Sequence, residues 1–475
     1  MATMLKFLRG NLVFGRSVGK RFMHSSAVCM QDMGIPYRGD YSQQAADARR
    51  QWVESVTKTS LSSLDGWWEP NDPFDEEHLI ANIENSIGVI RIPVGVVGPI
   101  DIHGKYASGT FFVPASTTEG TLLASATRGA ALLNKAGGVK AHAYRQRITR
   151  APTLYCNSAE DAERVGGWIQ SSLPILHEVV ASVSKRAQLK SVDFFIEEET
   201  LGSTTCSSIR GIVRGVARAS GAHGQGAVRA LLTRAGFSLP YIYWRPRTHV
   251  PRKKLNLVFA YDSAEAAGQD MSSTCTKACC DWIVDNVKEL DTKINGVMIE
   301  NGLSGDKHTS TINALFGRGV SVVARASIPN SLIESVLKLK AEKLIGGIGR
   351  DHQLKAMPSS VVIGNVPNMI AAMFAAFGQD LGSVVECSQV FLNIQKGQYV
   401  GYVDVELKMP SLAIGTVGGG TALPTQSQCL AMVGCQGEPN SSRKLAEIIA
   451  SVCLGAELSL LASNIKYRGL RTRKP

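Results

Sequence analysis

The sequence predicts a globular protein of mixed helices and strands, large enough for two or three domains. Its 475 residues can bury a substantial core, and a content of 44% hydrophobic and 19% charged residues is typical of an ordered protein. Apolar runs interrupted by Gly and Pro, which favour strands and turns, alternate with long stretches in which apolar residues recur at helical spacing. These observations together predict a fold that contains both helices and sheet.

Residues 1–27 have the composition of a mitochondrial import signal. They hold five bases interleaved with apolar residues, and no acid precedes Asp32. A secretory signal would need an unbroken apolar stretch of about seven residues, and none is present. The alternative is a basic terminus with no targeting role. We expect a presequence at residues 1–27 and a location in the mitochondrial matrix.

The following segments alternate between helix and strand signals. Residues 28–80 mix helix formers with acids and predict a small helical region, whereas residues 92–99 predict short strands and turns. Thr117 and Thr118 have N-cap hydroxyls ahead of apolar residues at helical spacing, which predicts a helix beginning there. Residues 160–195 predict helix followed by strand, and residues 255–260 predict a further strand.

Residues 200–254 differ in charge from everything around them. They contain ten bases and no acid, so their net charge of +10 nearly equals the +11 of the whole chain. Arg210, Arg214 and Arg218 recur every four residues and would form one cationic stripe on a helix. We interpret this segment as an insertion between two strands of a smaller domain. Its bases and aromatic residues suit an RNA or protein partner or an anionic membrane surface, and a solvated basic loop is the alternative.

Two other features have structural interpretations. The segment between Lys355 and Asp380 lacks charge, but its prolines, serines and asparagines disfavour a lipid-exposed helix, so we expect a buried core helix and no transmembrane segment. Ten cysteines occur without a C-x-x-C pair. Cys275 and Cys279 would share one helical face, where buried thiols are a simpler interpretation than a metal site, and we expect no metal.

A series of short motifs identifies a family by its order and spacing. The motifs are residues 84–88 (ENSIG), 92–99 (IPVGVVGP), 117–120 (TTEG), 149–152 (TRAP), 317–319 (GRG), 378–380 (GQD), 409–411 (MPS), 415–421 (GTVGGGT) and 456–460 (AELSL). In this order they resemble the motifs of 3-hydroxy-3-methylglutaryl-CoA (HMG-CoA) reductase. The chain resembles the eukaryotic catalytic domain, without a membrane anchor, more than the bacterial type.

The resemblance implies an α+β fold and a domain organisation. A large substrate-binding domain, at residues 81–151 and 297–475, would surround a central buried helix. A smaller ferredoxin-like cofactor domain would be inserted at residues 152–296 and would carry the basic insertion. Because the active site in this family forms between two subunits, the resemblance also implies a homodimer or a dimer of dimers.

The resemblance further implies a two-step reduction of HMG-CoA by NADPH, through mevaldehyde, to mevalonate and coenzyme A. Lys307 matches the lysine on the developing oxyanion, Glu119 the proton donor to the aldehyde, and Asp380 the aspartate between them. The substrate and cofactor positions implied by the same matching are Arg150, Asp306 and Asn368 for the acyl part, and Asp270, Met271, Gly418 and Gly419 for the dinucleotide.

Several positions depart from the family. The histidine that protonates the departing thiolate is replaced by Arg468, and no histidine follows His352. In the cofactor signature the glycine becomes Ser272 or Ser273, depending on whether the glycines or the aspartates are aligned, and the paired lysines become Lys307-His308. A further substrate lysine corresponds to Arg350. The sequence therefore leaves two hypotheses open: a reductase slowed by the lost histidine, in which His308 or water protonates the thiolate, or a non-catalytic subunit of a mitochondrial assembly.

Overall fold

The computed structural model describes residues 36–37, 40, 42–57, 82–198, 253–347 and 364–471. The expected presequence, the basic insertion up to residue 252 and Arg350 lie outside these residues. Two compact units make up the chain, residues 1–90 and 91–475. In the first unit, helix α1 (Gln43–Thr57) lies within the region of residues 28–80 for which the sequence predicts helix. Its Arg49 is fully buried and donates hydrogen bonds to the carbonyl oxygens of Tyr37, Asp40 and Ser86 at 2.8 Å each.

The second unit contains a two-stranded ribbon and an eight-stranded sheet. Strands β1 (Val94–His103) and β2 (Ser108–Ser116) form the antiparallel ribbon, where the sequence predicts strands from residue 92. The larger sheet has the order β7-β4-β6-β3-β8-β10-β9, and β5 pairs with β6. Its strands are β3 (Lys140–Arg150), β4 (Thr153–Cys156), β5 (Gln188–Glu198), β6 (Lys253–Asp262), β7 (Val297–Met298), β8 (Gly319–Pro329), β9 (Phe391–Lys396) and β10 (Tyr402–Leu412).

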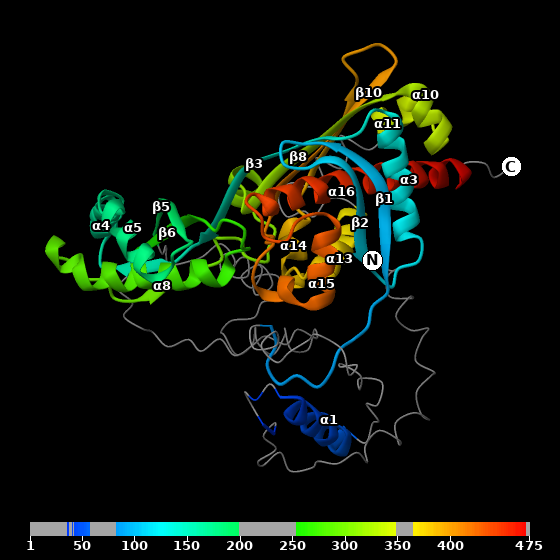
Figure 1. Cartoon of the computed structure of the whole chain (residues 1–475). Helices are drawn as coiled ribbons and strands as arrows, with labels where there is room; N and C mark the ends of the chain where they lie inside the picture. The colour runs from blue at the N-terminus through cyan, green and yellow to red at the C-terminus, as the bar shows by residue number, and fades with distance from the viewer. Residues whose placement is uncertain are drawn as a thin grey trace, which may run out of the picture. The chain divides into compact units, whose positions relative to one another are not determined.

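The segment from β4 to β7 has the ferredoxin-like arrangement that the resemblance implies. Its element order is β4, α4 (Ala159–Ser171), α5 (Leu173–Val183), β5, β6, α8 (Gln269–Asn286) and β7, and its antiparallel strands lie in the order β7-β4-β6-β5. A hydrophobic cluster of its own, formed by residues between 148 and 294, holds these helices on the sheet. Strand β3 is long enough to pair with β6 at one end and with β8 at the other (Figure 1).

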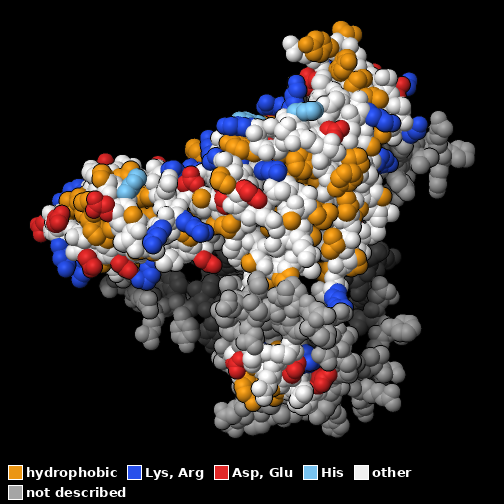
Figure 2. Space-filling view, viewed as in Figure 1, with side chains coloured by type: hydrophobic (Ala, Val, Ile, Leu, Met, Phe, Trp, Pro, Cys, Tyr) orange, Lys and Arg blue, Asp and Glu red, His pale blue; other side chains and the backbone are white. Residues whose placement is uncertain are grey.

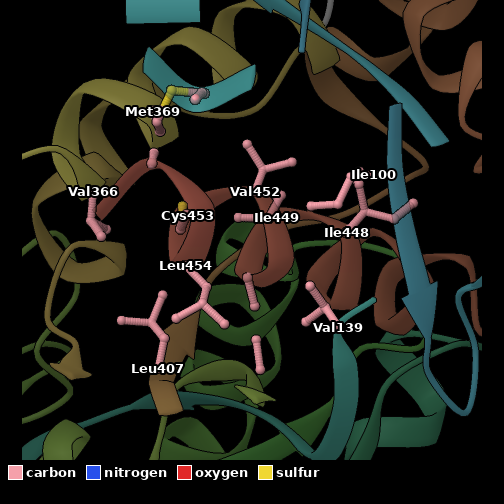
Figure 3. Packing of buried hydrophobic residues seen from close by; sticks show 14 of the residues in the cluster. Ile100, Val139, Val366, Met369, Leu407, Ile448, Ile449, Val452, Cys453 and Leu454 are labelled. Atoms are coloured by element: carbon pink, nitrogen blue, oxygen red, sulfur yellow. The ribbon is translucent and has the colours of Figure 1, made fainter. Parts of the chain in front are cut away.

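Helix α16 (Ser441–Arg471) runs through the centre of the larger hydrophobic cluster. Ile448, Ile449, Val452, Cys453 and Leu454 are at most 1% exposed, and Figure 3 shows them pointing in several directions from the helix into neighbouring elements. Burying each aliphatic side chain contributes roughly 1.5–3 kcal/mol. The stretch Ser441–Ile465 has the length and hydropathy of a membrane span, but 94% of its apolar window is buried inside the protein, as in a core helix. This is the central buried helix expected from the resemblance.

Two further helices pack on α16. Helix α3 (Leu122–Lys135) approaches so closely that a Cβ atom on Gly129 would lie 1.9 Å from the carbonyl oxygen of Gly455. Helix α13 (Val366–Phe377) contributes Met369 to the same core, which confirms the predicted buried helix for the part that the structure describes. Among the described residues of this unit, the remaining helices are α9 (Thr311–Phe316), α10 (Asn330–Leu332), α11 (Ala341–Gly347), α14 (Val384–Cys387) and α15 (Pro424–Met432), with short η2 (Val287–Leu290), η3 (Ile333–Leu337), η4 (Leu381–Ser383) and η5 (Gly419–Ala422).

The structure corrects one local prediction and confirms another. Helix α3 begins at Leu122, after Thr121 in the left-handed conformation (φ 71°), so Thr117 and Thr118 do not cap it. The Thr117 hydroxyl instead accepts the N–H of Glu119 at 2.9 Å in the preceding turn. Cys275 and Cys279 are buried thiols on α8 as predicted, and burial raises the pKa of Cys279 to about 12.

The surface of the second unit carries mixed charges with scattered apolar side chains (Figure 2). One apolar group lies at the tip of the β9–β10 hairpin, where Tyr399 is 67% exposed and Val400 is fully exposed. No metal-binding group of three His, Cys, Asp or Glu side chains occurs among the residues that the structure describes.

Candidate active site

Three of the predicted site residues lie on two loops that meet beside β8. The loop after β7 carries Asp306 and Lys307, and Asp380 follows α13 at the start of η4. The Nζ atom of Lys307 lies 2.9 Å from Oδ2 of Asp380. Oδ1 of Asp380 accepts the N–H of Gly382 at 2.8 Å, which fixes the carboxylate. A Cβ atom on Gly382 would lie only 3.0 Å from Cδ of Lys307, so the glycine leaves room for the lysine side chain.

The Lys307 ammonium is held in its charged form. Its pKa is raised, first by the hydrogen bond to Asp380 and then by the negative charges of Asp380, Asp306 and Glu386, against a partial desolvation. The side chain is 48% exposed, so the ammonium remains accessible to a ligand. A charged, accessible ammonium is suited to stabilising an oxyanion.

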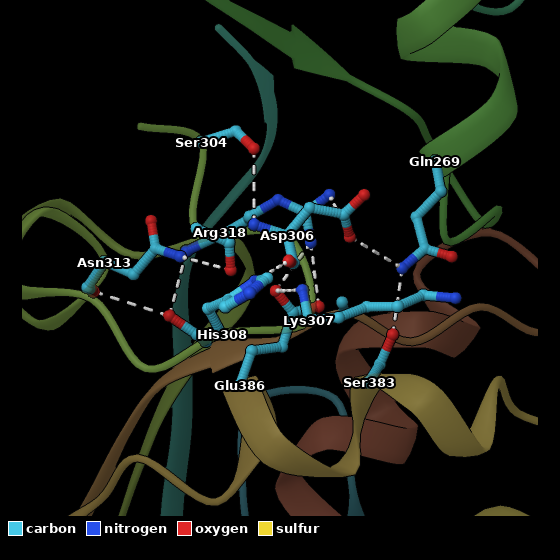
Figure 4. A network of polar contacts seen from close by, with 12 residues as sticks. Gln269, Ser304, Asp306, Lys307, His308, Asn313, Arg318, Ser383 and Glu386 are labelled. Atoms are coloured by element: carbon cyan, nitrogen blue, oxygen red, sulfur yellow. Dashed lines mark hydrogen bonds and ion pairs between the residues drawn. The ribbon is translucent and has the colours of Figure 1, made fainter. Parts of the chain in front are cut away.

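Beneath this pair lies a network of buried and partly buried charges (Figure 4). Arg150, which is 7% exposed, lies 3.1 Å from Oδ2 of Asp306 and 3.3 Å from Oε2 of Glu300. On the other side of the same carboxylate, Arg318 lies 3.0 Å from Oδ1 of Asp306. Arg318 also donates to both carboxylate oxygens of Glu386 at 2.7 Å. Asp306 is therefore held between two arginines at the base of the Lys307 loop.

Two of the three predicted substrate residues lie in this network, and the third lies outside it. The structure brings Arg150 and Asp306 into direct contact with each other. Arg150 also donates to the carbonyl oxygen of Gln269 at 3.1 Å, so most of its hydrogen-bonding capacity is used within the protein. Asn368 is exposed on the first turn of α13, and no hydrogen bond joins its side chain to the other site residues within the described part of the chain.

Glu119 stands apart from Lys307 and Asp380. It is exposed in the turn before α3, and its side chain makes no hydrogen bond or ion pair with any of the residues that the structure describes. The resemblance implies a Lys–Asp–Glu arrangement, of which this single chain shows the Lys307–Asp380 contact alone.

The predicted cofactor segments lie next to each other. The loop ahead of α8 and the glycine-rich loop form a parallel bridge between Ala266 and Val417, and Thr416 donates its N–H to the carbonyl oxygen of Glu265 at 2.7 Å. A Cβ atom on Gly415 would lie 2.4 Å from the nitrogen of Ala267, so only glycine permits this approach.

The individual cofactor candidates differ in their surroundings. Asp270 is exposed on the first turn of α8, whereas Met271 packs against the hydrophobic cluster of the ferredoxin-like segment. Gly418 and Gly419 have positive φ values of 81° and 54°, and no atom lies within 4 Å of a Cβ placed on either. Open space beside a glycine main chain next to a helix N-terminus is suited to a dinucleotide phosphate.

The serines that replace the family glycine also separate in the structure. Ser272 is fully buried, and its hydroxyl donates to the carbonyl oxygen of Gln269 at 2.8 Å. Ser273 is partly exposed and donates to the same oxygen at 3.1 Å. Of these two, Ser273 is therefore the side chain that a ligand at the start of α8 could meet.

Three residues of the network were not among the predicted site residues. Gln269 donates to Asp306 at 3.3 Å and to the Ser383 hydroxyl at 2.9 Å, and Glu386 accepts the N–H of Lys307 at 3.2 Å. Arg318 occurs within the GRG motif, so its type and place were visible in the sequence. Glu386 is the lone acid in the apolar stretch that follows the GQD motif. A single acid among apolar residues is a weaker indication of a site residue than a motif.

Comparisons with known proteins agree on one family. The family model described as hydroxymethylglutaryl-coenzyme A reductase matches residues 45–211 and 245–467. A 3-hydroxy-3-methylglutaryl-coenzyme A reductase of Aeropyrum pernix is 32% identical over 434 residues, covering 88% of this chain and 86% of that protein. The enzyme of Pyrococcus abyssi is 31% identical over 428 residues, covering 88% and 89%. Reductase 1 of Arabidopsis thaliana is 28% identical over 435 residues, covering 88% and 62%.

Solved structures support the fold. The class II reductase of Streptococcus pneumoniae, determined bound to NADPH in open conformations, aligns with a TM-score of 0.52 over 80% of this chain and 87% of that chain. Their sequences are 16% identical, so this likeness concerns the fold alone.

Proposed function

Because the chain belongs to the hydroxymethylglutaryl-coenzyme A reductase family, we propose that it reduces HMG-CoA to mevalonate and coenzyme A with NADPH. The observation that carries this proposal is the 2.9 Å contact between Lys307 and Asp380, two residues that the family motifs assign to the reaction. The carboxylate keeps the ammonium charged and oriented, while half of the lysine side chain stays accessible.

The residues present fit a dinucleotide. The first turn of α8 has N–H groups without helical partners, and the open main chain at Gly418 and Gly419 lies on the loop that runs beside the segment before α8. These residues would hold NADPH, which supplies the hydride when bound. The exposed Asp270 carboxylate in the same turn suits a hydroxyl donor better than a phosphate.

The chain's own residues would divide the remaining work. Lys307 stabilises the negative charge that develops on the substrate oxygen, and Asp380 holds the ammonium in place. Glu119 supplies the proton for the product oxygen. Since its side chain has no partner in the described part of one chain, a second subunit and bound substrate are expected to complete the site.

Thioester cleavage needs an acid for the departing thiolate, and this chain has Arg468 where the family has histidine. His308 is an alternative acid, because it directly follows the catalytic Lys307 in the sequence. Its Nδ1 lies 2.6 Å from the carbonyl oxygen of Asp306, so Nδ1 carries the proton in the neutral ring, and Nε2 has no partner within the described residues. In that neutral ring Nε2 carries no proton, so His308 could act as the acid only as an imidazolium that donates from Nε2. We expect this form of His308, or water, to protonate the thiolate at a lower rate than a positioned general acid would.

The test is product formation by the purified full chain. HMG-CoA and NADPH are supplied, mevalonate is measured by mass spectrometry, and coenzyme A is measured as free thiol. Lys307→Ala is expected to lower the rate by about 100-fold or more, the cost of losing an oxyanion donor. Lys190→Ala is the matched control, because Lys190 is 49% exposed and lies 3.5 Å from Asp262. No mevalonate from the unmodified chain, or equal rates for the two variants, would refute the proposal.

A further inference from the structure

A fully buried ion pair lies directly under the loop that carries Lys307. Arg318, which immediately precedes β8, and Glu386, on α14, are both 0% exposed. Nη1 of Arg318 donates to both carboxylate oxygens of Glu386 at 2.7 Å, although the two residues are 68 positions apart in the sequence. Figure 4 shows Glu386 pointing from its helix toward Arg318 and the main chain at Lys307.

The same carboxylate holds the catalytic loop. Oε2 of Glu386 accepts the main-chain N–H of Lys307 at 3.2 Å. Lys307 has a φ of 59°, a left-handed conformation that costs a non-glycine residue about 1 kcal/mol or more. An acceptor that fixes this N–H therefore compensates for an unfavourable main chain at the residue whose side chain meets Asp380.

We propose that Glu386 is a positioning residue: paired with Arg318, it fixes the main chain at Lys307 and thereby aims the lysine ammonium at Asp380 and the substrate. The kinetic part of this inference rests on the reductase activity proposed above. The structural part concerns the Lys307 loop alone and holds or fails without any measurement of turnover.

Folding stability is a poor explanation for this pair. Removing two charges from water costs several kcal/mol per ion, and neutral side chains of similar volume often serve a fold equally well. Moreover, Nε of Arg318 has no hydrogen-bond partner among the described atoms. Nη2 lies 3.0 Å from Oδ1 of Asp306, so the pair contacts the loop at Asp306 as well as at the Lys307 N–H. A pair that leaves a buried donor unsatisfied and contacts the loop at two neighbouring residues is better explained by its effect on that loop.

The charge on Glu386 responds to pH near neutrality. Burial raises the pKa of its carboxyl to about 7, against the opposing effects of Arg318 and the Lys307 N–H, while the negative charge of Asp306 raises it further. The Cys387 thiol on the same helix is fully buried, and burial raises its pKa well above the ordinary value, so it stays neutral. Below about pH 7, protonation weakens the pairing with Arg318, and the loop is then expected to loosen.

Hydrogen exchange on the full chain tests the structural part. In Glu386→Gln the charge is lost, and an NH2 group replaces one of the two oxygens that Nη1 of Arg318 faces. Two donors then meet, so the side chain can no longer hold both Arg318 and the Lys307 N–H as the carboxylate does. Exchange in peptides covering residues 303–310 is expected to rise by about tenfold or more. Glu447→Gln is the matched control, since Glu447 is also 0% exposed and accepts three main-chain N–H groups, from Tyr106, Ala107 and Ala143. Equal exchange in this loop for the wild type and both variants would overturn the proposal.

Kinetics test the functional part. Glu386→Gln is expected to lower kcat about 10- to 100-fold, with a smaller change in KM, because a misaimed ammonium affects the reacting geometry more than binding. The wild-type kcat should also fall as the pH drops through about 7, and this decline should be absent from Glu386→Gln and present in Glu447→Gln. A wild-type pH profile retained in Glu386→Gln would contradict the positioning role.

A double variant separates positioning from stability. If Glu386→Gln unfolds, Glu386→Met with Arg318→Met removes both buried charges together with the acceptor of the Lys307 N–H, and is expected to fold with nearly wild-type stability. It should remain slow, with rapid exchange at residues 303–310. Wild-type exchange and kcat in the double variant would overturn the proposal. An inactive wild-type chain would refute the proposed function, while the exchange comparison would still decide whether Glu386 fixes the loop.

Discussion

The side-chain amide of Gln379 holds the main chain of Gly415 from both sides. Its Oε1 accepts the N–H of Gly415 at 2.9 Å, and its Nε2 donates to the carbonyl oxygen of the same residue at 2.9 Å. A Cβ atom on Gly378 would lie 2.2 Å from the carbonyl oxygen of Gly420, so the two loops touch along their length. The GQD loop, which carries Asp380, and the glycine-rich loop are therefore joined by direct hydrogen bonds and close main-chain packing.

Gln379→Ala is expected to destabilise this joint. The substitution would leave the buried N–H and carbonyl groups of Gly415 without a hydrogen-bond partner, which costs about 1–3 kcal/mol for each group. The free energy of unfolding should therefore fall by at least about 2 kcal/mol. NADPH affinity should fall as well. Calorimetric unfolding and titration measure both. Gln436→Ala, at an exposed glutamine that donates to Ser427 at 3.3 Å, is the control. Similar free energies of unfolding for the two variants would contradict the claim that Gln379 joins the two loops.

Ser273→Gly is expected to strengthen NADPH binding by about tenfold, or about 1.4 kcal/mol, because it removes the partly exposed side chain where the family has glycine. Ser272→Gly should not strengthen binding, since Ser272 is fully buried, and it should cost up to about 1 kcal/mol of stability within the helix. Isothermal titration of both variants decides the point. Tight NADPH binding by the unmodified chain would contradict the premise that the serine in place of the family glycine weakens binding.

The two half-reactions should differ in rate. Reduction of free mevaldehyde expels no thiolate and should survive better than reduction of the thioester. Helix α16 spans position 468, whose side chain lies outside the described residues, and Arg468→His is expected to accelerate only the thioester step. The gain should approach about 100-fold, the lower end for a general acid. Single-turnover assays with each substrate measure it.

His308→Asn provides the companion experiment. If His308 protonates the thiolate, this variant should slow thioester reduction and spare mevaldehyde reduction, and Arg468→His should restore the first rate. If water is the proton source, His308→Asn should leave both half-reactions unchanged. Equal losses in both half-reactions would instead point to a role of His308 in holding the Lys307 loop.

Glu457 should make stability depend on pH. It is buried in α16, and Oε1 accepts the N–H groups of Asn365 and Val366 at 2.8 Å each. Burial raises the pKa of its carboxyl to about 7, so its contribution to stability is present below the ordinary pKa of about 4.5 and is lost as the pH rises to 7.

Substitution isolates this effect. Relative to the wild type, Glu457→Gln should gain stability between pH 4.5 and pH 7.5, by up to about 3 kcal/mol at ~1.4 kcal/mol per pKa unit. Denaturant unfolding at several pH values measures the difference. Glu447→Gln controls for the loss of a buried acceptor on the same helix. A pH-independent gap between Glu457→Gln and the wild type would contradict the prediction.

Residues 1–27 are expected to be removed on mitochondrial import, because they hold five bases and no acid. Intact-mass measurement of the protein from its native organelle should show a terminus near residue 28. A chain that retains Met1 there would contradict both the cleavage and the proposed matrix location.

Local patterns determined much of this protein from the sequence alone. The motif order identified the family, which the comparisons confirm, and the apolar stretch ahead of the GQD motif predicted the buried helix α13. Apolar periodicity is a property of neighbouring residues, so helix and strand types could be inferred locally. The start of α3 was placed too early, because a threonine hydroxyl that caps a helix and one that closes the turn before it look alike in the sequence.

Only the tertiary structure decided which charged residues are paired, which are buried and which stay exposed. Sequence matching assigned Arg150 to the substrate, yet its guanidinium is engaged by Asp306, Glu300 and Gln269. The sequence places Glu386 and Arg318 68 positions apart with no pattern that joins them. Whether a charge is free, paired or buried depends on which distant segments the fold packs against it, and packing changes its solvation and its pKa together. Motifs therefore name the groups at this site, and the fold determines which of them remain free to meet a substrate.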